Sequence, residues 1–215
     1  MLSMYSLVRG CRKNYLVLFL VLLLFLPACN GKKVAQNMES ETNTTNPPVE
    51  TTIYNIFQGD EEDRVKAGKI LDQIDRIDWK VYESVSNGET FELLDFLEEY
   101  LPDSDTDKKV NFFKATNHLD GAYGERYASI VKDLFFQDQK GTISLISRID
   151  PSKYEEMIDH LLYGFYDSPI SDDELDQIQD QVEELKKSDI TDSEKRVIDM
   201  FLNKMVEARG EDGYF

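Results

Sequence analysis

Cysteine and histidine are both scarce in this chain of 215 residues, which limits the chemistry that it can carry. The only cysteines are Cys11 and Cys29, and the only histidines are His118 and His160. For Cys29, which directly follows a leucine-rich run, four roles are open: a disulfide partner, a metal ligand, a catalytic thiol or an attachment point. Neither histidine has a second histidine or a cysteine at ligand spacing, so we expect no metal site.

The motifs of common catalytic sites are also missing from the sequence. It has no glycine-rich phosphate loop, no nucleophile elbow and no Ser/His/Asp order. Glu156 and His160 lie one helical turn apart, which favours a surface ion pair over half of a metal site, because a catalytic zinc needs three protein ligands. Carboxylates are so numerous that no pair stands out as acid and base. The sequence therefore predicts a non-enzymatic protein without a cofactor.

Basic residues are few compared with acidic ones. The chain has 24 Lys and Arg against 42 Asp and Glu, for a formal net charge of -18. Three of the basic residues, Arg9, Arg12 and Lys13, precede Cys29, so the rest of the chain is still more acidic. Such a surface repels phosphate backbones and anionic headgroups, which argues against nucleic-acid binding and electrostatic membrane docking. A basic or cation-bridged partner stays open, as does a charge that serves solubility alone.

One acidic stretch resembles the start of a calcium-binding loop. Asp103, Asp105 and Asp107 alternate as in an EF-hand. Counted from Asp103, however, Lys108 stands where glycine is needed for the turn, and Lys114 stands where a bidentate glutamate is needed. We expect a solvated loop between two helices here, with Asp107 as the candidate cap of the second.

Only one long hydrophobic run is present, from Tyr15 to Ala28. Arg9, Arg12 and Lys13 precede it, and a basic region followed by a hydrophobic one is typical of a signal peptide. Fourteen helical residues would cover ~21 Å, which is less than the ~30 Å of a hydrocarbon core. A permanent membrane span is therefore the weaker interpretation.

The end of this run, "LPAC" at 26–29, resembles a bacterial lipobox, the leucine-x-small-cysteine pattern of signal-peptidase II substrates. The resemblance implies that residues 1–28 are removed as a lipoprotein signal peptide and that acyl chains such as palmitate are attached at Cys29. Two or three chains anchor a protein firmly, since each buried CH₂ contributes about 0.8 kcal/mol. Cys11 would leave with the signal peptide, and the folded part would then have no disulfide and no free thiol. An ordinary cleaved signal or an uncleaved anchor is the alternative.

Residues 29–52 have almost no large apolar side chain and are rich in Asn, Thr, Glu and Pro. Such a segment cannot bury enough surface to offset its chain entropy, so we predict a disordered tether. A flexible chain of this length has a root-mean-square span of roughly 25 Å, enough to hold the next domain away from a membrane. We place that domain at residues 53–215.

Within this domain the apolar residues recur at steps of three and four, as at 154–165, 175–185 and 197–206. Ser171–Glu174 and Thr191–Glu194 read as capping boxes. No stretch shows the sustained alternation of a strand pair. We therefore predict an all-α fold, a compact multi-helix bundle after the tether. The expected helices are 60–78, 79–86, 90–101, 107–118, 123–136, 142–149, 151–166, 171–187 and 191–208.

One short sequence occurs twice. "RIDWKVYE" at 76–83 and "RIDPSKYE" at 148–155 share Arg, Ile, Asp, Tyr and Glu in register, 72 residues apart. Either the domain contains two diverged helical repeats, or the match is a coincidence in a chain rich in Ile, Asp and Glu. In both copies the aspartate, Asp78 or Asp150, is placed to cap the helix that follows.

The segment from 111 to 136 is dense in aromatic residues. Helical spacing assigns most of them to the core. Phe112 and Tyr123, which lie near the predicted loop at 117–124, are the candidates for an exposed contact with a partner protein, because aromatic side chains often dominate interface energetics.

The combination of a lipobox, a polar tether and an acidic, all-helical domain resembles the surface lipoproteins of Borrelia-type spirochaetes. The segment "ITDSEKRVIDMFLNKMVE" at 190–207 is similar in style to their small plasmid-encoded and repeat-bearing BTA121-type members. The resemblance implies display on the cell outer membrane and, for many members, virulence-associated binding of host proteins such as complement regulators or matrix components. The alternatives are a periplasm-facing lipoprotein that acts as an envelope adaptor, and an enzyme of unrecognised type.

Overall fold

Helices account for nearly all of the regular structure in the computed structural model, which describes residues 47–167 and 170–210. No strand occurs within these residues, and the predicted all-α fold is confirmed. All of them belong to one unit, Thr45–Phe215. The helices are α2 (Val49–Phe57), α3 (Asp63–Leu71), the 3-10 turn η1 (Ile74–Arg76), α4 (Trp79–Ser86), α5 (Thr90–Tyr100), α6 (Thr106–Lys114), α7 (Gly121–Gln137), α8 (Gln139–Ile146), the 3-10 turn η2 (Pro151–Lys153), α9 (Tyr154–Asp167), α10 (Asp172–Leu185) and α11 (Asp192–Gly210).

The folded part begins earlier than the sequence analysis predicts. Residues 49–52 belong to α2, so their assignment to a disordered tether is wrong. Among the residues of α2, Ile53 is fully buried in the core, and the carboxylate of Glu50 accepts a hydrogen bond of 2.9 Å from the backbone N–H of Asp78. Thr51 and Thr52, which suggested disorder, occupy half-buried positions of an amphipathic helix. The predicted signal peptide, Cys29 and the tether up to residue 46 lie outside the described residues.

The helix predicted at 60–78 is in fact two elements. α3 ends at Leu71, and η1 follows it. Ile74 and Ile77 are both fully buried, while the backbone at Ile77 is extended, so the chain turns around these two apolar anchors. Asp78 then caps α4 by accepting a hydrogen bond of 3.2 Å from the N–H of Val81. The apolar spacing alone did not reveal this break, because buried residues of the turn continue the helical pattern.

The two copies of the repeated sequence occupy equivalent places. Asp78 caps α4, and Asp150 caps η2 by accepting a hydrogen bond of 2.9 Å from the N–H of Ser152, so the predicted capping role is confirmed. Packing is also similar, since α2 contacts α3 and α4 as α7 contacts α8 and α9, and α3 contacts α6 as α8 contacts α11. The match does not extend to α5 and α10, because α5 contacts α3, α4 and α7 whereas α10 contacts α11. Two diverged helical repeats stay a hypothesis. The isoleucine and tyrosine of both copies are buried: Ile77, Ile149, Tyr82 and Tyr154.

A layer of aromatic rings fixes α9 between α7 and α11. The ring centroids of Phe135 and Phe165 are 5.8 Å apart, and those of Phe135 and Phe201 are 5.5 Å apart. His160 contacts Tyr127 and Phe165 contacts Phe135, so α7 and α9 run in the same direction. This shared direction brings the beginnings of α7 and α9 together.

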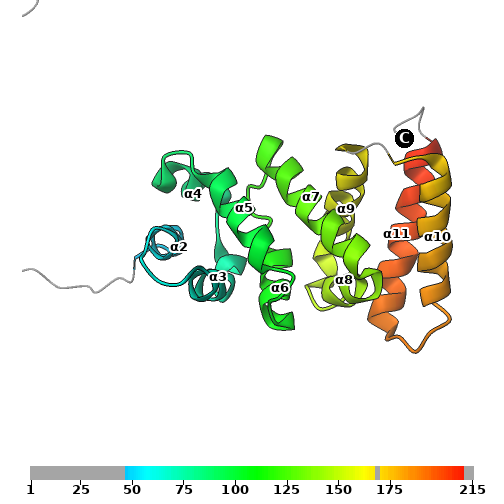
Figure 1. Cartoon of the computed structure of the whole chain (residues 1–215). Helices are drawn as coiled ribbons and strands as arrows, with labels where there is room; N and C mark the ends of the chain where they lie inside the picture. The colour runs from blue at the N-terminus through cyan, green and yellow to red at the C-terminus, as the bar shows by residue number, and fades with distance from the viewer. Residues whose placement is uncertain (1–46, 168–169, 211–215) are drawn as a thin grey trace, which may run out of the picture. The chain divides into compact units, whose positions relative to one another are not determined.

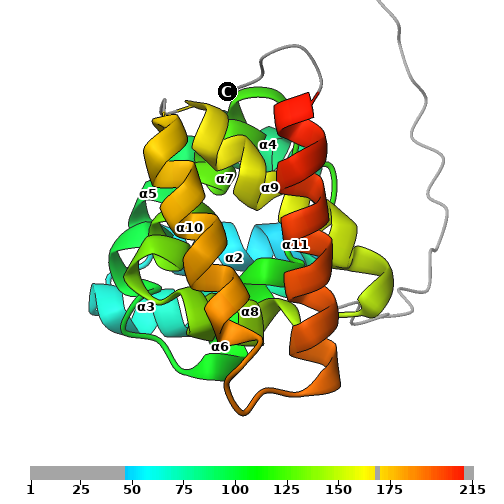
Figure 2. The ribbon, with the colours of Figure 1, turned by 90° about the vertical axis from the view of Figure 1, so that its right-hand side faces the viewer.

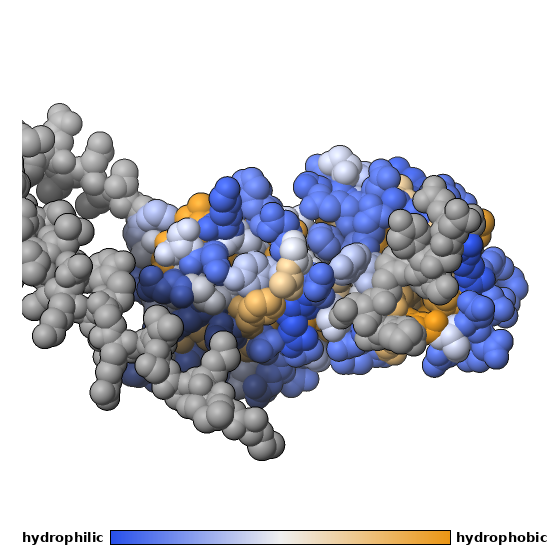
Figure 3. Space-filling model, turned by 90° about the horizontal axis from the view of Figure 1, so that it is seen from above, coloured by the Kyte–Doolittle hydropathy of each residue, from blue (hydrophilic) through white to orange (hydrophobic). Residues whose placement is uncertain are grey.

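The described helices follow one another from α2 at one end of the unit to α10 and α11, which lie side by side at the other (Figures 1 and 2). The face in Figure 3 is mostly hydrophilic, with hydrophobic residues in small separate patches. Such scattered apolar side chains are normal on a soluble surface. The large apolar side chains that the described part exposes are Val65, Val81, Phe91, Phe136, Tyr163 and Val206.

Candidate functional site

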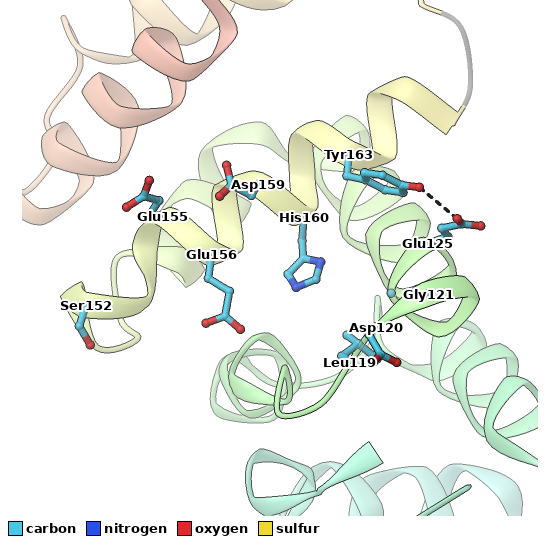
Figure 4. A pocket seen from close by; sticks show the side chains of 11 residues that line it. Leu119, Asp120, Gly121, Glu125, Ser152, Glu155, Glu156, Asp159, His160 and Tyr163 are labelled. Atoms are coloured by element: carbon cyan, nitrogen blue, oxygen red, sulfur yellow. Dashed lines mark hydrogen bonds between the residues drawn. The ribbon is translucent and has the colours of Figure 1, made fainter. Parts of the chain in front are cut away.

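A cavity of about 630 Å³ opens between the start of α7 and one face of α9 (Figure 4). We call it the α7–α9 pocket. One wall consists of the loop before α7 and the first turns of that helix, and the other consists of η2 and α9. Most of its polar side chains are carboxylates, and its lining includes no Lys or Arg among the described residues. The carboxylates are Asp120, Glu125, Glu155, Glu156 and Asp159.

The loop wall is held in place by the start of α4. Trp79 donates hydrogen bonds from its indole to the carbonyl of Ala115, at 2.6 Å, and from its backbone N–H to the carbonyl of Asn117, at 3.2 Å. The backbone of His118 is left-handed, with φ of 56°, and its Nδ1 lies 2.8 Å from the carboxylate of Asp78. These contacts position the next residues, Leu119 and Asp120, at the pocket. The loop therefore depends on the first copy of the repeated sequence.

The helical wall is fixed by the second copy. The carboxylate of Asp150 accepts hydrogen bonds from the N–H and the hydroxyl of Ser152, at 2.9 and 2.8 Å. The hydroxyl of Tyr154 donates to the carbonyl of Ser147 at 2.8 Å, which ties the start of α9 to the end of α8. From there, residues 156, 160 and 163 follow at steps of four and three, so they lie on one face of α9. That face lines the pocket.

His160 is the central group of this face. Figure 4 shows its imidazole extending from α9 toward Leu119 and Asp120. The ring is half-buried and packs edge-on against Tyr127, with 5.3 Å between centroids. Neither ring nitrogen has a recorded hydrogen bond to another residue in the described part of the chain. Burial lowers the pKa of His160, although the charges of Glu156 and Asp159 oppose this shift. A neutral imidazole that can accept a hydrogen bond therefore faces the cavity at neutral pH.

Two lysines outside the lining offset part of its negative charge. The Nζ of Lys153 lies 2.6 Å from a carboxylate oxygen of Glu156. The Nζ of Lys204, on α11, lies 2.6 Å from a carboxylate oxygen of Asp159 and 3.1 Å from one of Glu155. Burial alone would raise the pKa of Glu156, but hydrogen bonds from Lys153 and Thr116 outweigh burial and lower it. Glu156 therefore remains ionised at neutral pH.

The two carboxylates on the α7 side have no lysine or arginine partner among the described residues. Glu125 accepts a hydrogen bond of 3.0 Å from the hydroxyl of Tyr163, the dashed line in Figure 4. Asp120 stands at the N-cap position of α7, but its side chain makes no capping hydrogen bond. With five carboxylates and two lysines, the pocket carries three uncompensated negative charges when His160 is neutral.

The structure separates the two aromatic residues that the sequence offers as partner contacts. Phe112 has 0% of its surface exposed and stacks on Tyr127 at 4.9 Å, so its prediction as an exposed contact is wrong. Tyr123 is half-buried and packs at 4.7 Å against Phe91, which is 39% exposed. A hydrogen bond with Glu83 raises the pKa of Tyr123. A partner contact at Tyr123 stays a prediction.

The acidic loop before α6 has a structural role. Asp105, and not Asp107, caps α6 by accepting a hydrogen bond of 3.0 Å from the N–H of Lys108.

The ion pair predicted between Glu156 and His160 does not form, since Glu156 pairs with Lys153. Within residues 47–167 and 170–210, no group of three or more His, Cys, Asp or Glu side chains could hold a metal ion.

Most of this pocket is not evident from the sequence. The sequence indicates Glu156 and His160, but not Asp120, Glu125 or Tyr163. The sequence feature that could have indicated the pocket is the helical spacing of residues 156, 160 and 163. These three side chains lie on one face of the helix, and each ends in a polar group. Nothing in the sequence indicates that this face meets the loop before α7.

Comparisons with known proteins give no match: no family profile, no curated protein and no solved structure is similar to this chain. In the described part of the chain, no helix combines the length and the hydropathy that a membrane crossing requires.

Proposed function

We propose that this chain is a lipid-anchored bacterial lipoprotein, displayed on the outer membrane surface, whose helical domain is a non-enzymatic module that binds a host protein. The observation that carries the proposal is the order of features before the domain. A basic segment, one hydrophobic run and "LPAC" at 26–29 follow one another in the order that export and lipid attachment at Cys29 require. The lipid chains would supply the membrane attachment.

The domain adds support for a binding role. The face in Figure 3 is largely hydrophilic, as expected for a protein displayed in water, and the exposed large hydrophobic side chains of the described part are scattered over several helices. The α7–α9 pocket is a concave feature in which several polar side chains could converge on a ligand group. Its walls come from well-packed helices and from a loop that Trp79 anchors, so the side chains are pre-positioned for binding.

Protease treatment of intact cells tests display. The wild-type chain should be digested while the outer membrane is intact, and a periplasmic control protein should survive. A Cys29→Ala variant removes the acceptor of the lipid and should no longer partition with membranes. If the wild-type chain survives until the outer membrane is opened, the protein faces the periplasm, and the envelope-adaptor alternative replaces surface display.

A further inference from the structure

We propose that the α7–α9 pocket receives an arginine side chain of a partner polypeptide. This inference rests on the proposed binding function and names the chemical group that the domain recognises. Three features of the pocket support this inference. They are its uncompensated negative charge, the His160 imidazole, whose nitrogens make no hydrogen bond in the described part of the chain, and a rim that is aromatic and apolar.

The charge selects a cationic group. Five carboxylates surround the cavity, and the lysines at its edge contact only the α9 side. Asp120 and Glu125, on the α7 side, have no cationic partner among the described residues. An anionic ligand would be repelled by both walls, whereas a cation would lie between carboxylates that belong to different helices.

His160 adds a requirement for hydrogen-bond donors. Its ring nitrogens have no recorded hydrogen bond in the described part of the chain, and the ring extends into the cavity (Figure 4). Burial favours the neutral form, in which one nitrogen accepts a hydrogen bond. A guanidinium group presents five N–H donors in one plane, so it can bind a carboxylate and the imidazole together.

The rim fits the remaining parts of an arginine side chain. Tyr163 is 44% exposed, and its ring lies along the pocket beside Glu125 (Figure 4). An aromatic face stacks well on a planar guanidinium. Leu119, which is 9% exposed, lines the pocket and offers a small apolar surface to the methylene stem of the ligand. Lysine would provide the charge but neither the planar donor set nor the stacking surface.

Binding can be followed through the two histidines of the full chain in detergent micelles, using ¹⁵N-resolved side-chain NMR. N-acetyl-arginine amide should shift the His160 signals in a saturable way, with a dissociation constant on the order of 1 mM, while the signals of the exposed His118 stay in place. N-acetyl-citrulline amide, which has nearly the same shape but no charge, should bind at least about 10-fold more weakly. Equal binding of the two compounds, or no shift of His160, overturns the proposal.

Spermidine separates the two sources of a cationic group. Weaker binding of spermidine than of the arginine probe supports recognition of a polypeptide side chain. Tighter binding of spermidine would assign the pocket to free polyamines and overturn the inference.

A matched pair of variants tests the location. Asp120→Asn and Asp180→Asn each remove one negative charge, but Asp180 is exposed on α10, away from the pocket lining. Asp120→Asn should weaken binding of the arginine probe roughly 3- to 10-fold, because it removes a carboxylate without breaking a capping hydrogen bond. Asp180→Asn should leave it unchanged. Equal weakening by both variants would show an effect of total charge and refute a defined pocket.

These outcomes are independent of the display experiment. A chain that is digested on intact cells but does not bind the arginine probe retains the proposed surface function and loses this inference. A chain that binds the probe but survives on intact cells retains the pocket and loses surface display.

Discussion

Gly164 allows α9 to approach α7 closely, and its replacement by alanine tests the packing that forms the pocket. A Cβ added at Gly164 would lie 2.5 Å from the carbonyl oxygen of Ala128 and 2.9 Å from the Cβ of Lys132. Neither atom is the far end of a flexible side chain, so no rotamer change can relieve the contact. Gly164→Ala should therefore push the two helices apart.

The expected cost follows from two opposing effects. Overpacking a well-packed core costs typically 1–3 kcal/mol, so about 2 to 3 kcal/mol is reasonable for contact with a backbone carbonyl. Alanine gains about 1 kcal/mol over glycine in helix propensity. The net loss in the free energy of unfolding is then about 1 to 2 kcal/mol. For a chain of this size it lowers the Tm by about 2 to 8 °C.

Thermal unfolding followed by circular dichroism measures this difference, and the chain supplies a matched control. Gly68 lies inside α3, and a Cβ there would meet only the Cε of Lys108, at an ordinary 3.7 Å. Gly68→Ala should therefore stabilise the fold by up to about 1 kcal/mol through helix propensity. If Gly164→Ala is as stable as wild type while Gly68→Ala behaves as expected, the close approach of α7 and α9 is refuted.

Three further changes have defined outcomes. Because burial lowers the pKa of His160, the unfolded chain takes up that proton first, and wild type should lose stability as the pH falls from about 7 to about 5. In urea titrations at both pH values, His160→Gln should lose less stability than wild type over this range, and equal losses in the two proteins would contradict the reasoning. Arg126→Lys should cost about 1 kcal/mol in urea unfolding at pH 7, because lysine cannot reproduce the guanidinium hydrogen bonds to two carboxylates of α5. An unchanged urea midpoint for Arg126→Lys would contradict this role of the guanidinium group. Thr191→Ala should cost about 1 kcal/mol and speed amide exchange in the first turn of α11, because it breaks the reciprocal hydrogen bonds with Glu194. Unaltered exchange there would show that the cap is dispensable.

Apolar spacing predicts helix bounds well where a capping residue directly precedes a periodic row of apolar residues. The helix expected at 79–86 has the bounds of α4, and those expected at 171–187 and 191–208 differ from α10 and α11 by one or two residues. The capping boxes are formed in both of the last cases. Prediction was poorer where composition and pattern disagree, as in α2, where Thr51 and Thr52 resemble a linker although Ile53, the next residue, is buried.

The pocket could not be predicted because it depends on which helices become neighbours. Periodicity shows which face of a helix is apolar, but not which loop that face will meet. Phe112 and Tyr123 illustrate the same limit. Both are aromatic and near one loop, but Phe112 stacks on Tyr127 and is buried, whereas Tyr123 packs against the exposed Phe91 and is only half-buried. Such contacts join residues far apart in the chain.

Mass spectrometry of the N-terminus, on protein isolated from the membranes of its native cell, tests the central claim most directly. The account predicts a chain that begins at Cys29, with a diacylglyceryl group on the sulfur and an acyl chain on the amine. A chain that still begins at Met1, or one that carries an unmodified Cys29, would contradict lipid anchoring.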